Sequence, residues 1–292
     1  MNPPVSSLVV GAFGQVGAQI VRALGPNCST SSSRKGDAPG TVQLDLALLT
    51  AESARALLAE HAPDAVYCVG GMTDVERCES ESSLAMRVNC DGPAHLSAAA
   101  AARNLPFVYF STEYIFNGLS GPYHEDDVPD PINAYGNSKL QGEIEVLNAH
   151  PSPLILRTTV VYGPDPGEKN FLYSLRRTLQ AGRPLRVPYD QISTPTFNRD
   201  LAANAVALVR AGVTGVFHVC GPERMSRLEL AQRAAQFMGF SDAAISGVPT
   251  SELGQSARRP LSAGLVSGKL RTIDAHVPMR ALDDSMRDWM GQ

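Results

Sequence analysis

The sequence predicts an α/β fold: a Rossmann-type doubly wound parallel sheet with a smaller C-terminal substrate-binding lobe. Short apolar runs alternate with helical patterns over the first part of the chain, which implies a parallel sheet with helices on both faces. The first run leads into a glycine-rich turn and then a helix. Beyond residue 163 the pattern loosens, with frequent glycine and proline. We therefore place a mainly dinucleotide-binding domain at 1–163 and a mainly substrate-binding lobe at 164–292, with some return to the core sheet.

The glycine turn comes directly after the first predicted strand, residues 7–10. Its spacing, with glycine at positions 11, 14 and 17, differs from the G-x-G-x-x-G of the commonest dinucleotide fingerprint. Glycines let the backbone approach a diphosphate, and the next helix offers free N–H groups at its start. A turn that only packs against a helix would look similar. The position of the glycine turn, directly after a strand at the N-terminus, favours phosphate binding. The helix that follows the turn is expected to end at Gly25-Pro26.

The second strand, expected near residues 27–33, ends in Ser33, Arg34 and Lys35. A cofactor with a free ribose 2′-hydroxyl usually meets a carboxylate at this point. Serine hydroxyls and two cations suit a 2′-phosphate instead, although a solvated basic loop would have the same composition. We therefore expect NADP (NADPH) rather than NAD.

Residues 42–46 and 65–69 are expected to form the third and fourth strands. Asp45, at the end of the third, can accept a hydrogen bond from an adenine amino group or cap the next helix, 48–61. The fourth strand ends in a small-residue loop, residues 70–73, where a doubly wound sheet binds its ligand. A long helix is expected from about residue 79 to residue 103. Asn89, inside it, either binds a buried water or carbonyl or is an ordinary polar helix residue.

The fifth strand, residues 107–110, precedes Thr112, and a later helical segment carries Tyr135 and Lys139. One helical turn separates the tyrosine from the lysine, so both side chains lie on one face. A nearby ammonium lowers the pKa of a phenol, which can then exchange a proton with a carbonyl or alcohol near pH 7. Tyr-x-x-x-Lys alone is more often a packed aromatic beside a solvated lysine. Thr112, at the end of an adjacent strand, makes the catalytic interpretation the better one.

The rest of the chain gives less detail. A sixth strand is expected at 154–157, and helices near 170–180, 200–210 and 227–238. The net charge of -4 argues against a nucleic-acid partner, and no apolar run is long enough to span a bilayer. Five scattered cysteines and six histidines show no metal-ligand spacing, and no secretory signal is apparent. We expect a cytoplasmic protein without a metal, and leave a homodimer open.

Taken together, these motifs resemble those of the extended short-chain dehydrogenase/reductase family, and most closely its dTDP-4-dehydrorhamnose reductase branch. The resemblance covers nearly the whole chain. The segments that carry it are 11–17 (GAFGQVG), 111–118 (STEYIFNG), 135–140 (YGNSKL), 157–163 (RTTVVYG), 169–171 (KNF), 190–196 (DQISTPT) and 258–260 (RRP).

The resemblance implies roles for individual residues. The catalytic trio would be Thr112, Tyr135 and Lys139, with Asn89 as a candidate fourth member. The NADP-binding set would be Gly11, Phe13, Gly14, Gln15, Val16, Ser33, Arg34, Asp45, Leu46, Gly70, Gly71, Thr73, Asn89, Tyr135 and Lys139. The residues facing a sugar nucleotide would be Glu113, Val160, Asn170, Gln191 and Arg259.

The implied activity is the NADPH-dependent reduction of a ketone, most simply that of a nucleotide-activated 4-keto-deoxysugar. Two residues depart from the branch: Glu113 stands where it usually has Asp, and Val160 where it usually has Trp. The branch also includes the regulatory beta subunit of methionine adenosyltransferase, so a cofactor-binding regulatory subunit is one alternative. A sugar-nucleotide epimerase or dehydratase is another.

Overall fold

The computed structural model describes residues 6–25, the backbone of 30–33, and residues 41–291. In this part of the chain a parallel seven-stranded sheet has the order β11-β6-β5-β4-β1-β2-β3. Its strands are β1 (Ser7–Val10), β2 (Thr30–Ser33), β3 (Thr41–Gln43), β4 (Ala65–Cys68), β5 (Phe107–Thr112), β6 (Leu154–Thr158) and β11 (Gly215–His218). The predicted doubly wound parallel sheet is confirmed.

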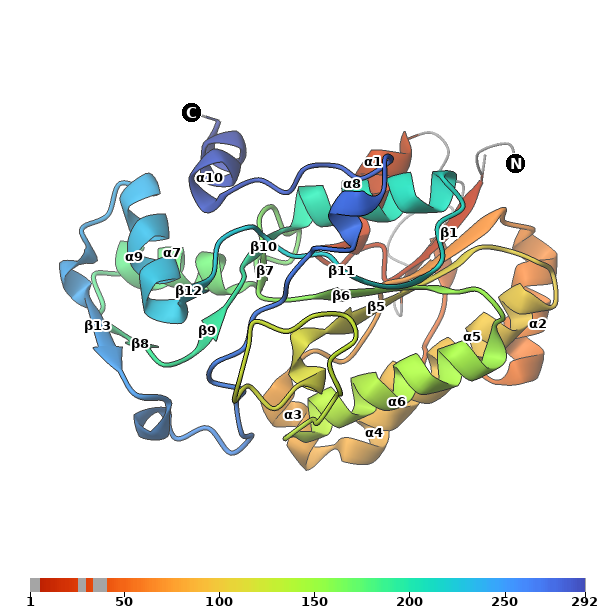
Figure 1. Ribbon diagram of the computed structural model, residues 1–292, viewed down its shortest axis with the longest axis horizontal. Coiled ribbons are helices and arrows are strands. Elements are labelled where there is room, and N and C mark those ends of the chain that lie inside the picture. Colours follow the sequence, from red (N-terminus) through yellow and green to blue (C-terminus); the bar gives the residue numbers. More distant parts are fainter. Residues whose placement is uncertain (1–5, 26–29, 34–40, 292) are drawn as a thin grey trace.

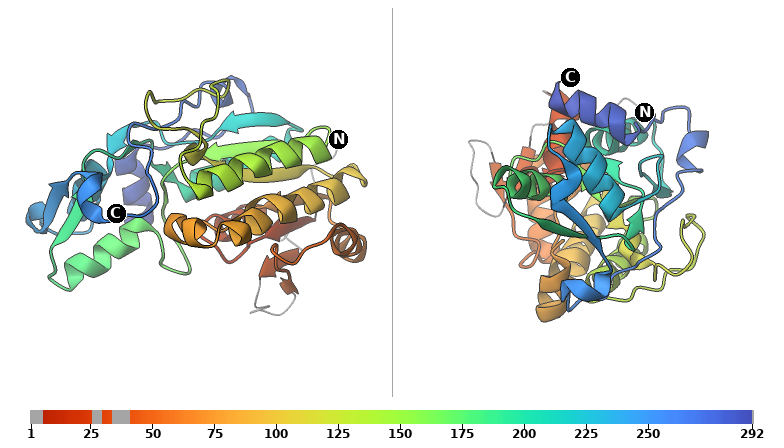
Figure 2. Two further views of the ribbon diagram at one scale, coloured as in Figure 1. Left: turned by 90° about the horizontal axis from the view of Figure 1, so that it is seen from below. Right: turned by 90° about the vertical axis from the view of Figure 1, so that its left-hand side faces the viewer.

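Helices cover both faces of this sheet (Figure 1). On one face lie α1 (Gly17–Leu24) and α8 (Asn198–Arg210), packed over an apolar core that includes Val9, Phe110 and Leu156. On the other lie α2 (Ala51–His61), α5 (Gly92–Ala101) and α6 (Ala134–Ala149). Helices α5 and α6 run side by side across the sheet (Figure 2). Strand β11 and helix α8 come after residue 163 in the sequence, yet they pack with the main sheet, as the expected return to the core sheet requires. The domain boundary between residues 163 and 164 stays a prediction.

The remaining elements gather at one end of the molecule, at the left of Figure 1. Their common core is apolar and includes Leu172, Leu230 and Met286. The elements are β7 (Val161–Tyr162), α7 (Phe171–Gln180), β8 (Leu185–Pro188), β9 (Ile192–Ser193), β10 (Thr196–Phe197), β12 (Met225–Ser226), α9 (Arg227–Phe237), β13 (Ile245–Val248) and α10 (Leu282–Met290). Short 3-10 turns lie at Asp242–Ala244 and Thr250–Leu253 in this group, whereas Leu270–Thr272 packs in the core of the main sheet and Glu113–Ile115 follows β5.

Two helix predictions were wrong at their boundaries. The helix expected at 48–61 begins at Ala51, because Thr50 caps it by accepting a hydrogen bond from the Ser53 amide. The single helix expected over 79–103 is broken at Glu81, whose backbone leaves the helical region. It is replaced by α3 (Val75–Ser80), α4 (Ser82–Met86), a π-helical turn, η2 (Arg87–Asp91), and α5.

Helix α6 lies unusually close to its neighbours. Asn133 caps its first turn by accepting a hydrogen bond from the Gly136 amide (2.7 Å). A Cβ on Gly136 would lie 2.0 Å from the Tyr114 carbonyl oxygen, and one on Gly142 would lie 2.2 Å from that of Asn89. The two glycines therefore let the helix pack against the chain that follows β5 and against η2.

Replacing Gly142 by alanine tests this close packing. In a helix this exchange normally stabilises by about 0.5–1 kcal/mol. Here the new methyl group would also meet the Tyr109 hydroxyl at 2.3 Å. We expect Gly142→Ala to lower the free energy of unfolding in denaturant by roughly 1–3 kcal/mol. Asn137→Ala, exposed on the same helix, is the control and should change it by less than about 0.5 kcal/mol. Equal stability of Gly142→Ala and wild type would contradict the packing.

Candidate active site

The predicted catalytic residues meet at the carboxyl end of the sheet. Thr112 ends β5 and is buried, and its hydroxyl accepts a hydrogen bond from the Tyr114 amide (3.2 Å). Tyr135 lies in the first turn of α6, and its ring packs edge-on against Tyr114, with centroids 5.5 Å apart. The Thr112 side chain lies near enough to the Tyr135 hydroxyl to lower the pKa of that phenol. The strand and the helix thus bring together two hydroxyls that lie far apart in the sequence.

The Tyr135 phenol keeps its proton over the neutral range. Burial raises its pKa, and the nearby Thr112 side chain opposes that effect. The expectation that Lys139 lowers this pKa is therefore not met, because the loss of hydration outweighs the favourable interactions. A phenol that stays protonated is the form that can give a proton to a substrate oxygen.

Lys139 lies one turn further along α6 and is only 5% exposed. Its ammonium group sits over the Tyr109 ring, with Nζ 3.9 Å from the ring centroid. Burial lowers the pKa of Lys139 to about 8, and interactions with Cys68, Glu143 and Cys90 oppose this. The lysine is consequently still mostly charged at pH 7, but within reach of deprotonation.

Asn89, in the π-helical turn η2, connects the β4 loop to α6. Its side-chain oxygen accepts a hydrogen bond from the Met72 amide (2.8 Å). Its amide nitrogen donates to the Met72 carbonyl (3.0 Å) and to the Ser138 hydroxyl (2.9 Å). The Asn89 carbonyl accepts from Tyr109 (2.6 Å). The completely buried side chain is thus committed to protein partners, so Asn89 aligns the loop with the catalytic helix.

The glycine turn between β1 and α1 has the shape of an anion cradle. Gly11 has a φ of +85°, and a Cβ there would lie 2.7 Å from the Gly70 Cα. A Cβ on Gly17 would lie 2.1 Å from the Gly11 carbonyl oxygen, and the Gly14 amide donates to that oxygen (3.0 Å). The buried Gln15 side-chain oxygen has no hydrogen-bond partner in the described structure. Such a glycine-lined turn at a helix N-terminus fits a dinucleotide diphosphate.

The other residues predicted to bind the cofactor differ from one another in their exposure and in their contacts. Phe13 is exposed, Val16 precedes the first turn of α1, and Leu46 packs in the core. Asp45 accepts a hydrogen bond from the Ala47 amide (3.0 Å) and so closes a tight turn rather than capping α2.

The loop after β4 and the end of β2 complete this set. Gly70 is half-buried, whereas Gly71 and Thr73 are exposed. Ser33 ends β2, but its side chain, like the whole of Arg34 and Lys35, lies outside the described part of the chain. The expected 2′-phosphate contacts therefore stay a prediction.

Glu113, directly after Thr112, is a buried carboxyl group only 2% exposed. Its Oε2 accepts a hydrogen bond from the Gly264 amide (2.9 Å), which ties the end of β5 to the C-terminal part of the chain. Burial raises the pKa of Glu113 to about 7, opposed by Thr159, Gly264 and then by two arginines, Arg227 and Arg224. Glu113 thus carries a carboxyl group that titrates near neutrality inside the site.

Val160 forms a strained point in the segment after β6. Its φ of +36° is rarely adopted by a β-branched residue, and its carbonyl accepts a hydrogen bond from the Thr196 amide (3.2 Å). Asn170 caps α7 by accepting from Leu172 (3.1 Å), and it donates to the Gly163 carbonyl (2.9 Å). Both residues therefore shape the backbone of this segment, and their contact with substrate stays a prediction.

Two more residues predicted to bind substrate contact other protein groups. Gln191 donates to the Thr250 hydroxyl (3.1 Å). Arg259 donates to Glu76 in the first turn of α3 (2.6 Å), which links the segment after the Thr250–Leu253 turn to the helix that follows the β4 loop. The Arg259 side chain is 9% exposed, and its buried Nε has no partner among the described residues. Arg259 thus keeps unused donor capacity.

Sequence reasoning missed Arg227, the first residue of α9. Its guanidinium lies 4.8 Å from the centre of the Phe171 ring, and both Glu113 and Arg259 act on it electrostatically. Burial lowers the pKa of Arg227. An isolated arginine in the sequence gives no signal for this role, since only the fold brings α9 beside Arg259.

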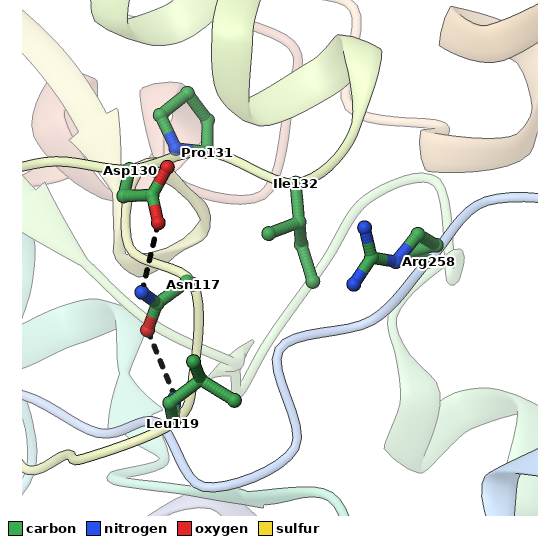
Figure 3. Close-up of a pocket in the computed structure, with 6 residues that line it drawn as sticks. All are labelled: Asn117, Leu119, Asp130, Pro131, Ile132 and Arg258. Carbon is green, nitrogen blue, oxygen red and sulfur yellow. Dashed lines mark hydrogen bonds between the residues drawn. The ribbon is translucent and has the colours of Figure 1, made fainter.

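A separate pocket of about 420 Å³ lies next to the start of α6 (Figure 3). It is lined by Asn117, Leu119, Asp130, Pro131, Ile132 and Arg258. Asn117 donates to Asp130 and accepts from the Leu119 amide, so the loop holds its own shape. None of Thr112, Tyr135 and Lys139 lines this pocket, which is therefore distinct from the candidate active site.

Within residues 6–25 and 41–291, no helix is long and apolar enough to cross a membrane. The same residues contain no group of three or more His, Cys, Asp or Glu side chains placed to hold a metal ion.

Comparison with known proteins decides the family. The family model described as the RmlD substrate binding domain matches residues 6–288. The chain belongs to this family. Its predicted resemblance to the dTDP-4-dehydrorhamnose reductase branch is thereby confirmed.

Several named relatives of this RmlD-family chain are reductases. It is 33% identical to a probable low-salt glycan biosynthesis reductase of Haloferax volcanii, with 87% of each chain covered. It is also 33% identical to a dTDP-4-keto-6-deoxy-D-glucose reductase of Streptomyces niveus, covering 87% of this chain and 85% of that one. Its fold matches the dTDP-4-dehydrorhamnose reductase of Bacillus anthracis, solved in complex with NADP, with a TM-score of 0.89, 26% identity and 99% of both chains covered.

The raised pKa of Glu113 predicts a pH-dependent stability. Between its ordinary pKa of 4.5 and its folded value of about 7, the folded protein binds more protons at this group than the unfolded one. Stability therefore falls as pH rises through this range, by roughly 1–3 kcal/mol. Glu113→Gln removes the titration, so its melting temperature relative to wild type should rise between pH 5 and pH 8.

The control for this measurement is Glu60→Gln, whose side chain is 75% exposed. Its melting temperature should follow that of wild type across the same range. Parallel curves for Glu113→Gln and wild type would show that Glu113 does not titrate near pH 7.

Proposed function

We propose that this chain is an NADPH-dependent reductase acting on the ketone of a nucleotide-activated 4-keto-deoxysugar. The observation that carries the proposal is the meeting of Thr112 and the protonated Tyr135 at the end of β5, on the same edge of the sheet as the glycine cradle. The names of the related reductases support the substrate class. They also favour this function over a regulatory subunit and over an epimerase or dehydratase.

The residues around the site have distinct parts in this reaction. NADPH, when bound, supplies hydride to the carbonyl carbon. Tyr135 holds the proton that the carbonyl oxygen takes up, and Thr112 orients that oxygen by a hydrogen bond. Lys139 contributes positive charge on the same helix face, which favours the phenolate left after proton transfer.

The cofactor and the substrate diphosphate have separate candidate sites. Gly11, Gly14 and the start of α1 would hold the cofactor diphosphate, and the 2′-phosphate preference rests on Ser33 and Arg34. Arg259, with an unused buried Nε, and Arg227 would hold the diphosphate of the sugar nucleotide.

Tyr135→Phe tests the proton donor. The substitution removes the hydroxyl and leaves the ring, so its packing against Tyr114 should survive. With a dTDP-4-keto-6-deoxysugar as substrate, we expect kcat to fall by about 10²–10⁴-fold while NADPH affinity measured by calorimetry changes little. A variant with near-normal kcat would exclude Tyr135 as the donor.

Arg259→Ala tests the diphosphate site and should be compared with Glu76→Gln. If Arg259 binds substrate, its removal should raise KM for the sugar nucleotide by roughly ten- to a hundredfold. Glu76→Gln weakens the Arg259–Glu76 ion pair but keeps the cation, so its KM should change much less. Equal effects of the two variants would mean that Arg259 serves only to hold the chain against α3.

A further inference from the structure

A buried ion pair lies one helical turn beyond Lys139. Glu143, also on α6, is only 2% exposed and lies on the same helix face as the lysine. Arg157, near the end of β6, donates two hydrogen bonds to the Glu143 carboxylate, from Nε at 3.0 Å and from Nη2 at 2.7 Å. This bidentate geometry fixes the orientation of the carboxylate.

Arg157 is itself held in place by neutral partners. Its Nη1 donates to the Glu125 carbonyl (3.1 Å) and lies 3.5 Å from Nε2 of His218. Burial and the neighbouring Arg157 lower the pKa of His218 to about 3, so that ring is neutral at pH 7. The Glu125 carboxylate is turned to the His218 amide (3.0 Å). Within the described residues, Glu143 is therefore the ion-pair partner of Arg157.

The groups that face Lys139 come from four elements. They are Cys68 at the end of β4, Cys90 in η2, Tyr109 on β5 and Glu143 on α6. Burial raises the pKa of Cys68 to about 12 and that of Cys90 to about 11, and it holds the pKa of Tyr109 well above its usual value. These three groups are neutral at pH 7, which leaves Glu143, the ion-pair partner of Arg157, as the negatively charged neighbour.

We propose that Glu143, fixed by Arg157, is the positioning residue that keeps Lys139 charged at neutral pH. Without a fixed negative charge close by, burial would favour the neutral amine. The Glu143–Arg157 ion pair also joins α6 to β6, so the contact that supplies the charge also holds the catalytic helix in position against the sheet. The inference rests on the role of Lys139 in the proposed function.

The titration of Lys139 can be observed directly, because the chain has so few lysines: Lys35, Lys139, Lys169 and Lys269. In protein labelled with ¹³C,¹⁵N-lysine, the Lys139 signal is assigned by its absence in Lys139→Arg, and its side-chain shifts are followed with pH. In the wild type we expect an ammonium at pH 7. In Glu143→Gln the Lys139 titration should move to lower pH by about one unit. A neutral Lys139 in wild type at pH 7 would overturn the proposal.

Three variants separate charge from structure. Glu145→Gln, exposed on the same helix, is the matched control and should leave the Lys139 titration unchanged. Glu143→Asp retains the charge and should restore most of the wild-type titration. Glu143→Leu combined with Arg157→Met removes both charges at similar volume, so no unpaired charge is buried. This double variant should also lower the Lys139 titration, but by less than Glu143→Gln, in which the unpaired Arg157 cation adds to the effect.

The outcomes also distinguish this inference from the proposed reductase. An unchanged Lys139 titration in Glu143→Gln and in the double variant would refute the role of Glu143, whatever the enzyme does. A shifted titration in a protein that reduces no 4-keto sugar nucleotide would leave the role of Glu143 standing and remove the proposed function. If both hold, the fall of kcat/KM at high pH should begin about one unit lower in Glu143→Gln than in wild type.

Discussion

The close approach of α6 to the sheet is the constraint on which the rest of this structure depends. Gly136 and Gly142 permit it, since a side chain at either position would overlap the backbone after β5 or in η2. Asn89 then bonds to both the β4 loop and Ser138 on the same helix. Because the β4 loop, η2, the chain after β5 and the helix are joined in this way, a small shift of α6 would separate Tyr135 from Thr112.

Burial is the main electrostatic influence on the site. It raises the pKa values of Tyr135 and Glu113 and lowers that of Lys139, so each of these groups favours its neutral form more than it would in water. The ion pair of Glu143 with Arg157 supplies a fixed charge against this tendency. Such a site keeps the Tyr135 phenol protonated and the nearby Lys139 charged, which suits proton transfer to a carbonyl oxygen.

Sequence patterns predicted the elements whose signals are local. The buried strands, the glycine turn and the one-turn spacing of Tyr135 and Lys139 depend on neighbouring residues only. The break at Glu81 was missed although Ser80, Ser82 and Ser83, residues that favour helix ends, flank it. The start of α2 was missed because Thr50 competes with Asp45 as a cap. The Glu113–Gly264 hydrogen bond and the Arg259–Glu76 ion pair join distant segments, so only the fold could reveal them.

The most direct test of the proposed function is the fate of the hydride. The protein would be incubated with a dTDP-4-keto-6-deoxysugar and NADPH deuterated at the transferable position, and the sugar product analysed by mass spectrometry and NMR. We predict one deuterium at C4 of the sugar for each NADP formed. A sugar product without deuterium, or no oxidation of NADPH with this substrate class, would contradict the assignment of this chain as a sugar-nucleotide ketone reductase.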